Sequence, residues 1–377
     1  MSPPGRPKGE SLSAQREGSP VSRRLVVERR SDAGSLAAWI APAIALLLTV
    51  VTCMLLFALL GRAPQQVVEV FFIAPLATLR GWGEVGLKAA PLILCGVGLA
   101  LCFRANVWNI GAEGQLIAGA IAGGGVALLT SAASGGGWFV LVLLAGAAGG
   151  MAWAGLAAWL RDRFNANEIL VTLMLVYVAQ LLLVYVVRGP WRDAAGFGFP
   201  QTAMFASGAR MPVLVPGTRL HIGLPLALAA AALAWGLLQR TAIGLQLRAH
   251  GVAPRAARYA GFSGRHTLWF TMLGCGALAG IAGAAEAAGP IGQLTPAVSP
   301  GYGFAAIIVA FAARLHPLGV CVSGFVMALL YIGGELAQSR LGLPAALTGV
   351  MQGTWLFALL ACEALARIGV RWRGAAA

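Results

Sequence analysis

The chain has 377 residues, of which 59% are hydrophobic and only 11% are charged, and its mean hydropathy is +0.79. Soluble domains carry about 25% charged residues, so these values exclude an ordinary soluble enzyme and predict an all-α polytopic membrane protein. The net charge of +14 could indicate a polyanionic partner. However, the arginines lie singly or in small groups between apolar runs, which is typical of membrane topology and not of nucleic-acid binding.

The first 35 residues form a polar segment that is rich in Pro, Ser, Gly and basic side chains. This segment has too few large apolar residues to build a core, so we expect residues 1–35 to be a disordered basic cytoplasmic tail. The apolar run Leu36–Leu60 follows. It is longer than the core of about 7–15 residues in a secretory signal, and we interpret it as an uncleaved first membrane span.

Nine further apolar runs follow, so we expect about ten transmembrane helices of about 20 residues each. These runs are Leu87–Phe103, Ile110–Leu129, Trp138–Leu160, Ile169–Val187, Ile222–Leu238, Thr267–Ala288, Phe304–Ala313, Leu318–Ala337 and Pro344–Ala366. The run Phe304–Ala313 is short and could be broken, tilted or re-entrant. The earlier segment Pro64–Trp82 mixes apolar and polar residues, and we predict an interfacial helix there.

The distribution of Lys and Arg predicts the orientation, because cytoplasmic loops carry the excess of these residues. With the N-terminus inside, 19 of the 27 Lys and Arg residues lie on the cytoplasmic side. Both chain ends are therefore predicted to be cytoplasmic. In this topology residues 188–221 form an external loop, and residues 239–266 form a basic cytoplasmic segment.

Ionisable residues within apolar runs are costly and are therefore candidates for function. Glu113, Glu286 and Glu335 are such residues, and Glu113 has the most polar neighbourhood, with Asn109 and Gln115 close in sequence. On a continuous helix Asn109 and Glu113 would share a face. Asn109, Glu113 and Gln115 are therefore our candidates for a polar substrate pathway, and we expect them to affect transport more than assembly. The alternative is a hydrogen-bonded clamp between helices.

Two local patterns have structural interpretations. Asn167 is a plausible N-cap, and Glu168 then lies in the first helical turn, where a carboxylate complements the helix dipole. Repeated Gly-x-x-x-Gly motifs, such as those at Gly119, Gly146 and Gly276, predict close packing between helices.

The cytoplasmic segment Arg248–Gly261 is predicted to form one short helix. Pro254 suits its first position and Gly261 the position after its end. An Ala-rich helix in a loop has neither a membrane nor a core of its own to pack against. We therefore interpret it as a docking helix for another protein. The alternative is that Arg255 and Arg258 only fix the topology.

The chain also lacks the residues of an ATPase site. Its only lysines are Lys8 and Lys88, and neither lies in a Walker loop, G-x-x-x-x-G-K-[ST]. The four histidines and six cysteines show no metal-ligand spacing. We therefore expect a non-enzyme with no cofactor and no metal site in this chain.

Three motifs in this order make the chain recognisable over about residues 36–370. They are FRANVWNIGAEGQ from Phe103, FNANEILVTLML from Phe164 and the segment Arg248–Gly261. Together they resemble the permease subunits of ABC importers for simple sugars and nucleosides. Two residues depart from the pattern: Ala253 stands where relatives often carry a capping Asn, and Val176 stands where the nucleoside-type pattern usually has Asn.

The resemblance implies a permease fold that pairs with a second permease subunit, either a copy or a paralogue. It also implies two cytoplasmic ATP-binding subunits that hold ATP and Mg²⁺, an extracellular or periplasmic substrate-binding protein, and a place in the bacterial plasma membrane. The short loop helix corresponds to the coupling helix that meets the ATPase. The residues carried over for this contact are Arg248, Gly251, Pro254, Arg255, Ala256, Ala257, Arg258, Tyr259 and Gly261.

The predicted function is therefore that of the transmembrane subunit of an ABC importer, which moves a nucleoside or simple sugar by alternating access. One alternative is an ion- or proton-coupled secondary transporter that uses Glu113, Glu286 and Glu335. A second is an ABC permease for another small solute, such as a branched-chain amino acid. A structural membrane scaffold is a third, but it would not need polar residues within a span.

Overall fold

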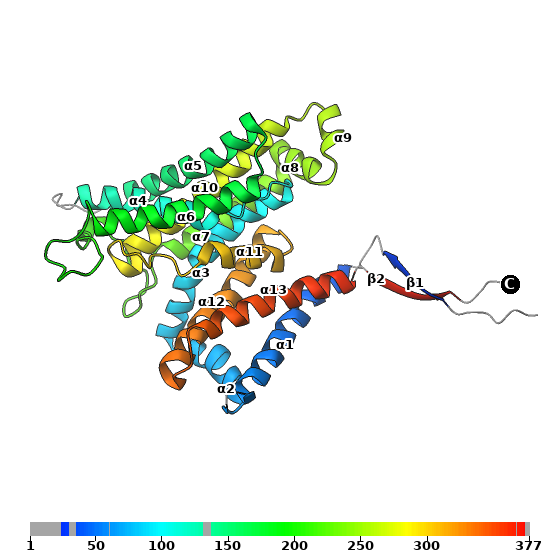
Figure 1. The fold of residues 1–377 in the computed structure, drawn as a ribbon, viewed down its shortest axis with the longest axis horizontal. Helices are drawn as coiled ribbons and strands as arrows, with labels where there is room; N and C mark the ends of the chain where they lie inside the picture. Colours follow the sequence, from blue (N-terminus) through cyan, green and yellow to red (C-terminus); the bar gives the residue numbers. More distant parts are fainter. Residues whose placement is uncertain (1–23, 30–34, 60, 131–136, 367, 374–377) are drawn as a thin grey trace, which may run out of the picture.

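The protein is described by a computed structural model that covers residues 24–29, 35–59, 61–130, 137–366 and 368–373. Most of the predicted disordered tail lies outside these residues. Within that tail the structure places strand β1 (Arg24–Arg29), which pairs antiparallel with β2 (Ile368–Arg373) near the C-terminus. Neither strand was predicted from the sequence. Figure 1 shows this short sheet extending away from the helices.

All other regular elements among the described residues are helical. In chain order they are α1 (Ser35–Leu59), α2 (Gln65–Val68), the π-helix η1 (Glu69–Ile73), the 3₁₀-helix η2 (Ala74–Leu76), α3 (Leu79–Arg104), α4 (Ala112–Leu129), α5 (Trp138–Phe164), α6 (Glu168–Arg188), the 3₁₀-helix η3 (Ser207–Ala209), α7 (Gly223–Arg240), α8 (Ala242–Val252), α9 (Pro254–Tyr259), α10 (Gly264–Glu286), the π-helix η4 (Ala287–Ile291), α11 (Tyr302–Ala312), α12 (Pro317–Leu341) and α13 (Ala346–Ala366).

The helices confirm the predicted all-α polytopic membrane fold. Within the described residues, eight helices are long and apolar enough to cross a bilayer, namely α1, α3, α4, α5, α6, α7, α10 and α12. The two remaining predicted runs coincide with the shorter apolar helices α11 and α13. The placement of both chain ends in the cytoplasm stays a prediction.

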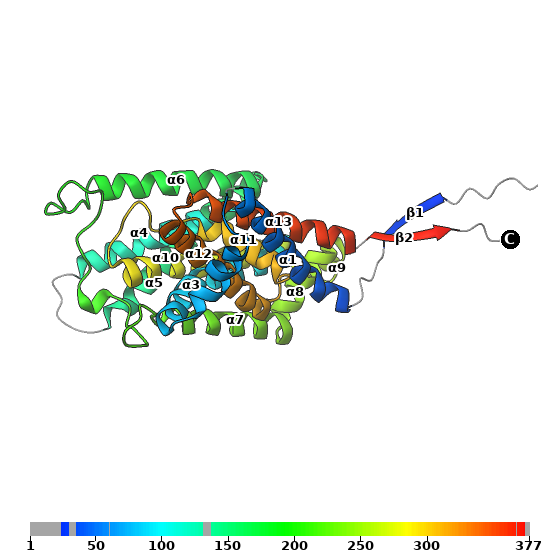
Figure 2. The ribbon, with the colours of Figure 1, turned by 90° about the horizontal axis from the view of Figure 1, so that it is seen from below.

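Helix α3 is the centre of the molecule. It is almost entirely buried and packs against α10, α12, α11 and α7. In Figure 1 the helices α4, α5, α6 and α10 lie on one side of it, and α1 and α13 pack together on the other. Figure 2 shows the molecule from below, with α6 along one edge, α7 along the opposite edge and α3 between them.

Helix α3 begins at Leu79, eight residues before the predicted apolar run. The acidic residue in this early part, Glu84, has a partner, so it can be accommodated in a helix. Glu84 forms an ion pair with Arg219, and Lys88 forms one with Glu335. The side chain of Thr78 caps the helix by accepting a hydrogen bond from the Gly81 nitrogen.

The segment predicted as an interfacial helix is more buried than expected. Its helical turns α2, η1 and η2 place Val67 and Phe71 inside the protein. Phe71 packs against α12 at Gly333, which has no side chain to obstruct the ring, and makes an edge contact with Phe57 of α1. The segment therefore anchors α1 to the central helices.

The Gly-x-x-x-Gly motifs mark the closest helix crossings, as predicted. Gly280 of α10 meets the backbone of Gly146 and Gly150 on α5, and Gly119 of α4 meets Gly280 from another side. The backbones are too close there to admit a Cβ atom. The helices α4, α5 and α10 thus form one tightly packed unit.

Candidate functional site

The predicted site residues lie in two separate places, one at the end of the helical bundle and one in its interior. The first place is the segment α8–α9, and Figure 1 shows α9 protruding beyond the helices around it. Helix α9 begins at Pro254, as predicted. The expectation of one helix over Arg248–Gly261 is wrong, because the chain breaks between α8 and α9 at Ala253, whose φ and ψ are −145° and 77°. A residue before proline disfavours the helical conformation.

Helix α9 exposes nearly all of its side chains. Tyr259 is 95% exposed and Val252, at the end of α8, is 88% exposed. Arg255 and Arg258 are also exposed. We call these four residues the docking tip. An exposed aromatic ring and an exposed aliphatic side chain beside two arginines favour contact with another protein over contact with water alone.

The remaining predicted coupling residues hold the tip in shape. Ala257 is only 3% exposed and faces the protein. Gly261 has a φ of +84°, and its nitrogen donates to the Arg258 carbonyl oxygen at 3.0 Å. This left-handed turn after α9 is the C-terminal geometry that favours glycine. As expected from Ala253, no side chain in the described part of the chain caps the start of α9. Ala256 is exposed.

Helix α8 connects the docking tip to the membrane-spanning helices. Gly251 packs directly on the carbonyl oxygen of Arg104, the last residue of α3. Gln246 donates to the Ser263 carbonyl oxygen at 3.1 Å and to the Thr267 hydroxyl at 3.2 Å, which joins α8 to α10. The side chain of Arg248 donates back to the Gly244 carbonyl oxygen at 3.3 Å. A displacement of α9 would therefore reach α3 and α10 through short, direct contacts.

The neighbouring helix ends are fastened by charged contacts. Asp162 of α5 pairs with Arg265 at 2.8 Å and accepts a hydrogen bond from the Trp269 indole nitrogen at 3.1 Å, both on α10. Asn167 caps α6, as predicted, by accepting from the nitrogens of Ile169 and Leu170. The ends of α5, α6 and α10 thus form a rigid base beside α8 and α9.

The second place is a buried polar cluster of Asn109, Glu113 and Gln115. The amides of Asn109 and Gln115 pair in both directions at 3.1 Å. The expectation that Asn109 and Glu113 share one helix face is wrong, because α4 begins only at Ala112. The Asn109 side chain accepts from the Gly111 nitrogen at 3.0 Å, and such a local bond competes with helix formation.

Glu113 connects α4 to the half-length helix α11. Its side chain is 1% exposed, and its Oε2 atom accepts from the Gly303 nitrogen at 2.6 Å. The nitrogens of Gly301 and Tyr302 donate to the Ser299 hydroxyl. The first N–H groups of α11 are therefore satisfied by a side-chain carboxyl group and a hydroxyl, and the carboxyl group lies at the positive end of the helix dipole.

Two residues that were not predicted as site residues, Lys88 and Tyr302, contact the other two candidate acids, the buried Glu286 and the exposed Glu335. The Tyr302 hydroxyl donates to Glu286 at 3.4 Å, and Lys88 lies 5.5 Å from the centroid of the Tyr302 ring while it pairs with Glu335 at 3.4 Å. Lys88 could have been selected from the sequence, because it is a lone lysine at the start of an apolar run. Nothing in the sequence around Tyr302 would have selected it as a site residue. The three candidate acids are thus all partnered within the chain.

Comparison with known proteins gives consistent matches. Residues 84–360 match the model of the family described as branched-chain amino acid transport system / permease component. The chain is 37% identical to a glucose ABC transporter permease of Haloferax volcanii over 81% of this chain and 83% of that protein. It is 31% identical to a guanosine ABC transporter permease of Bacillus subtilis, over 71% and 78% of the two chains. It is 25% identical to a nucleoside ABC transporter permease of Lactococcus lactis, over 79% and 84%.

Proposed function

The chain belongs to the branched-chain amino acid transport system / permease component family, and on this premise we propose that it forms the membrane pathway for a nucleoside or a simple sugar. It is the permease of an ABC importer and a multi-pass membrane protein. The solute class is supported by the names of its relatives, which are permeases for glucose, guanosine and nucleosides. We place the chain in the plasma membrane.

The single observation that carries the mechanism is the exposed docking tip on a firmly attached helix. We propose that ATP-binding subunits receive α9 and that their closure displaces it. The contacts of α8 with Arg104 and with α10 would pass this displacement to the central helices. The permease then alternates between states that are open to the two sides of the membrane, driven by ATP bound to the partner.

The proposed assembly follows from the same premise. ATP and Mg²⁺ belong to the ATP-binding subunits, since this chain carries no Walker loop. A second permease subunit, either a copy or a paralogue, would complete the pathway. The segment between α6 and α7 would lie on the outer side and face the substrate-binding protein.

The role of Asn109, Glu113 and Gln115 in the substrate pathway stays a prediction. Their observed partners are all internal, and Glu113 holds the start of α11. These contacts support a role in which the cluster positions α11 beside the pathway.

The test of the docking tip is a double charge reversal. In a complex of the permease with its ATP-binding subunits and substrate-binding protein, we expect Arg255→Glu with Arg258→Glu to lower ATP-driven uptake by about tenfold or more. The expected cause is loss of contact with the ATPase at a charged interface. Co-purification of the ATP-binding subunits should fall in parallel.

The matched control is Arg240→Glu with Arg314→Glu, which makes the same change in net charge at exposed positions outside α8 and α9. This control should transport within about twofold of the unsubstituted protein, the scatter of neutral surface changes. Equal uptake by the two double variants would contradict the proposed docking surface.

A further inference from the structure

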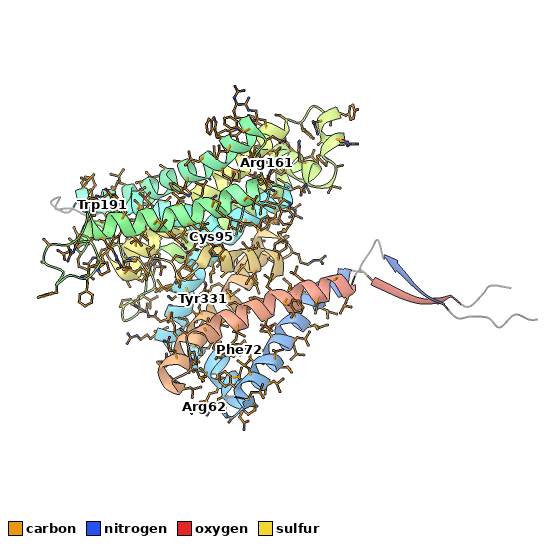
Figure 3. All side chains as sticks on the ribbon, viewed as in Figure 1. Arg62, Phe72, Cys95, Arg161, Trp191 and Tyr331 are labelled. Carbon is orange, nitrogen blue, oxygen red and sulfur yellow. The ribbon has the colours of Figure 1, made fainter. Side chains whose placement is uncertain are left out.

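A recess of about 490 Å³ lies between α11, α12 and α13. Small-molecule sites have volumes of about 300–1,000 Å³, so the recess is large enough for a single solute. Its lining includes Phe304 from α11, Tyr331 from α12, and Gly349, Gln352 and Gly353 from α13. Figure 3 shows Tyr331 on α12 in the region between α11 and α13.

The recess lies at the depth at which α11 begins. Helix α11 has 11 residues, which is about half the length needed to cross a hydrocarbon core of about 30 Å. The other end of α11 leads to Leu315, whose carbonyl oxygen accepts from Arg104 at the end of α3, close to Gly251 of α8. Because α11 is only half a span and this end lies beside α8, we infer that its first residues lie inside the membrane region. Gly301 and Phe304, at this end of α11, line the recess.

The lining offers aromatic surface and one free amide. Phe304 is 38% exposed, so its ring is available for contact. The Gln352 amide nitrogen is buried and has no hydrogen-bond partner among the described residues. At Gly349 and Gly353 a Cβ atom would meet none of the described atoms within 4 Å. An aromatic ring can stack on a base or on the apolar face of a sugar, while an amide can donate to a hydroxyl or a base oxygen.

The same lining disfavours charged solutes. None of the residues that the structure places around the recess carries a charge. The N–H groups at the start of α11, which could otherwise receive a carboxylate, are already occupied by Glu113 and Ser299. The ammonium and carboxylate of an amino acid would therefore lose water here without gaining partners.

We propose that this recess is the solute-binding site within the membrane and that it accepts an uncharged, ring-bearing, hydroxylated solute while rejecting zwitterionic amino acids. The inference rests on the proposed function and deepens it by assigning the place and the chemical selectivity of the site. A nucleoside and a simple sugar share the required chemistry, so guanosine and glucose serve as the two probes and leucine as the zwitterionic one.

The first test fills the recess without disturbing the packing. Gly353→Leu adds a side chain into open space, and we expect it to lower ATP-driven uptake of guanosine or glucose by about tenfold, the effect of losing one good stacking contact. Gly274→Leu is the matched control, because this glycine of α10 likewise has no described atom within 4 Å of an added Cβ. It should transport within about twofold of the parent. Equal uptake by the two variants would overturn the proposal.

A second readout does not depend on transport. Gly353→Cys places a thiol in the recess, and its reaction rate with a maleimide is measured against the parent chain. We expect guanosine or glucose to slow this reaction and leucine to leave it unchanged. Labelling that no probe slows, or that leucine slows most, overturns the assignment of the site. If the unsubstituted complex takes up neither guanosine nor glucose, the proposed solute class itself fails, which is a separate result.

Discussion

Among single residues, Glu113 makes the contact that matters most for the position of α11, because it accepts a hydrogen bond from the Gly303 nitrogen. It joins the start of α4 to the start of α11, 190 residues later in the chain. Gly303 makes this approach possible, because its missing side chain lets α11 rest on the backbone of Glu113. A buried carboxylate that accepts from backbone N–H groups is strongly bonded, and its loss leaves those groups unsatisfied.

We therefore expect Glu113→Ala to destabilise the protein by about 2 kcal/mol, because the buried Gly303 N–H group loses its acceptor. Glu113→Gln keeps an acceptor oxygen and should lose less. The measurement is the midpoint temperature at which the detergent-solubilised protein loses its monodisperse peak after heating. Glu69→Ala, at an exposed acid, is the control and should leave the midpoint unchanged. Full thermal stability with lost uptake in Glu113→Ala would instead favour direct contact with the solute.

For single residues, positions at helix ends and turns were predictable from the local sequence, whereas partners far away in the sequence were not. Pro254, Gly261 and Asn167 take the positions that their own backbone preferences dictate. The placement of Asn109 on a helix was wrong, because its side chain bonds to the backbone two residues ahead. The partners of Glu113 and Lys88 lie nearly 200 residues or more away, and nothing in the local sequence indicates them.

At the scale of elements, the packing unit of α4, α5 and α10 provides the rigid half of the molecule. Its glycines allow the helix backbones to touch at Gly280, Gly146 and Gly119. Close contact of this kind stabilises helices in a membrane, where the hydrophobic effect does not drive them together.

We expect Gly280→Ala to lower the thermal midpoint, because an added methyl group would collide with the α5 backbone and overpacking costs about 1–3 kcal/mol. Gly274→Ala on the same helix is the control. It faces open space among the described residues and should be neutral or slightly stabilising, since Ala favours a helix by about 1 kcal/mol over Gly. A Gly280→Ala protein as stable as the Gly274→Ala protein would contradict this packing role.

The elements themselves were largely predictable from apolar runs. All ten runs coincide with helices, and the short run at Phe304–Ala313 is indeed the short helix α11. The start of α3 was missed by eight residues because apolarity alone does not reveal that Glu84 finds a partner. The recess between α11, α12 and α13 was not predictable, since it depends on how three helices separated in sequence come together.

At the scale of the whole molecule, the chain is one subunit of an ABC importer. It carries a tip that faces away from its own core, and its sequence contains no Walker loop. The alternative of an ion- or proton-coupled transporter would use the acids within the apolar runs, of which Glu113 and Glu286 are buried and Glu335 is exposed. However, Glu113, Glu286 and Glu335 are each held by a partner within the chain, which supports a structural role for them and not a relay.

The most direct test of this account is uptake by proteoliposomes that contain the permease, its ATP-binding subunits and the substrate-binding protein. With labelled guanosine or glucose outside, we expect uptake that requires ATP on the ATPase side and that a protonophore leaves unchanged. Liposomes with a Walker-lysine variant of the ATP-binding subunit should take up nothing above background. Uptake that continues without the ATP-binding subunits and stops with the protonophore would contradict the account and establish the ion-coupled alternative.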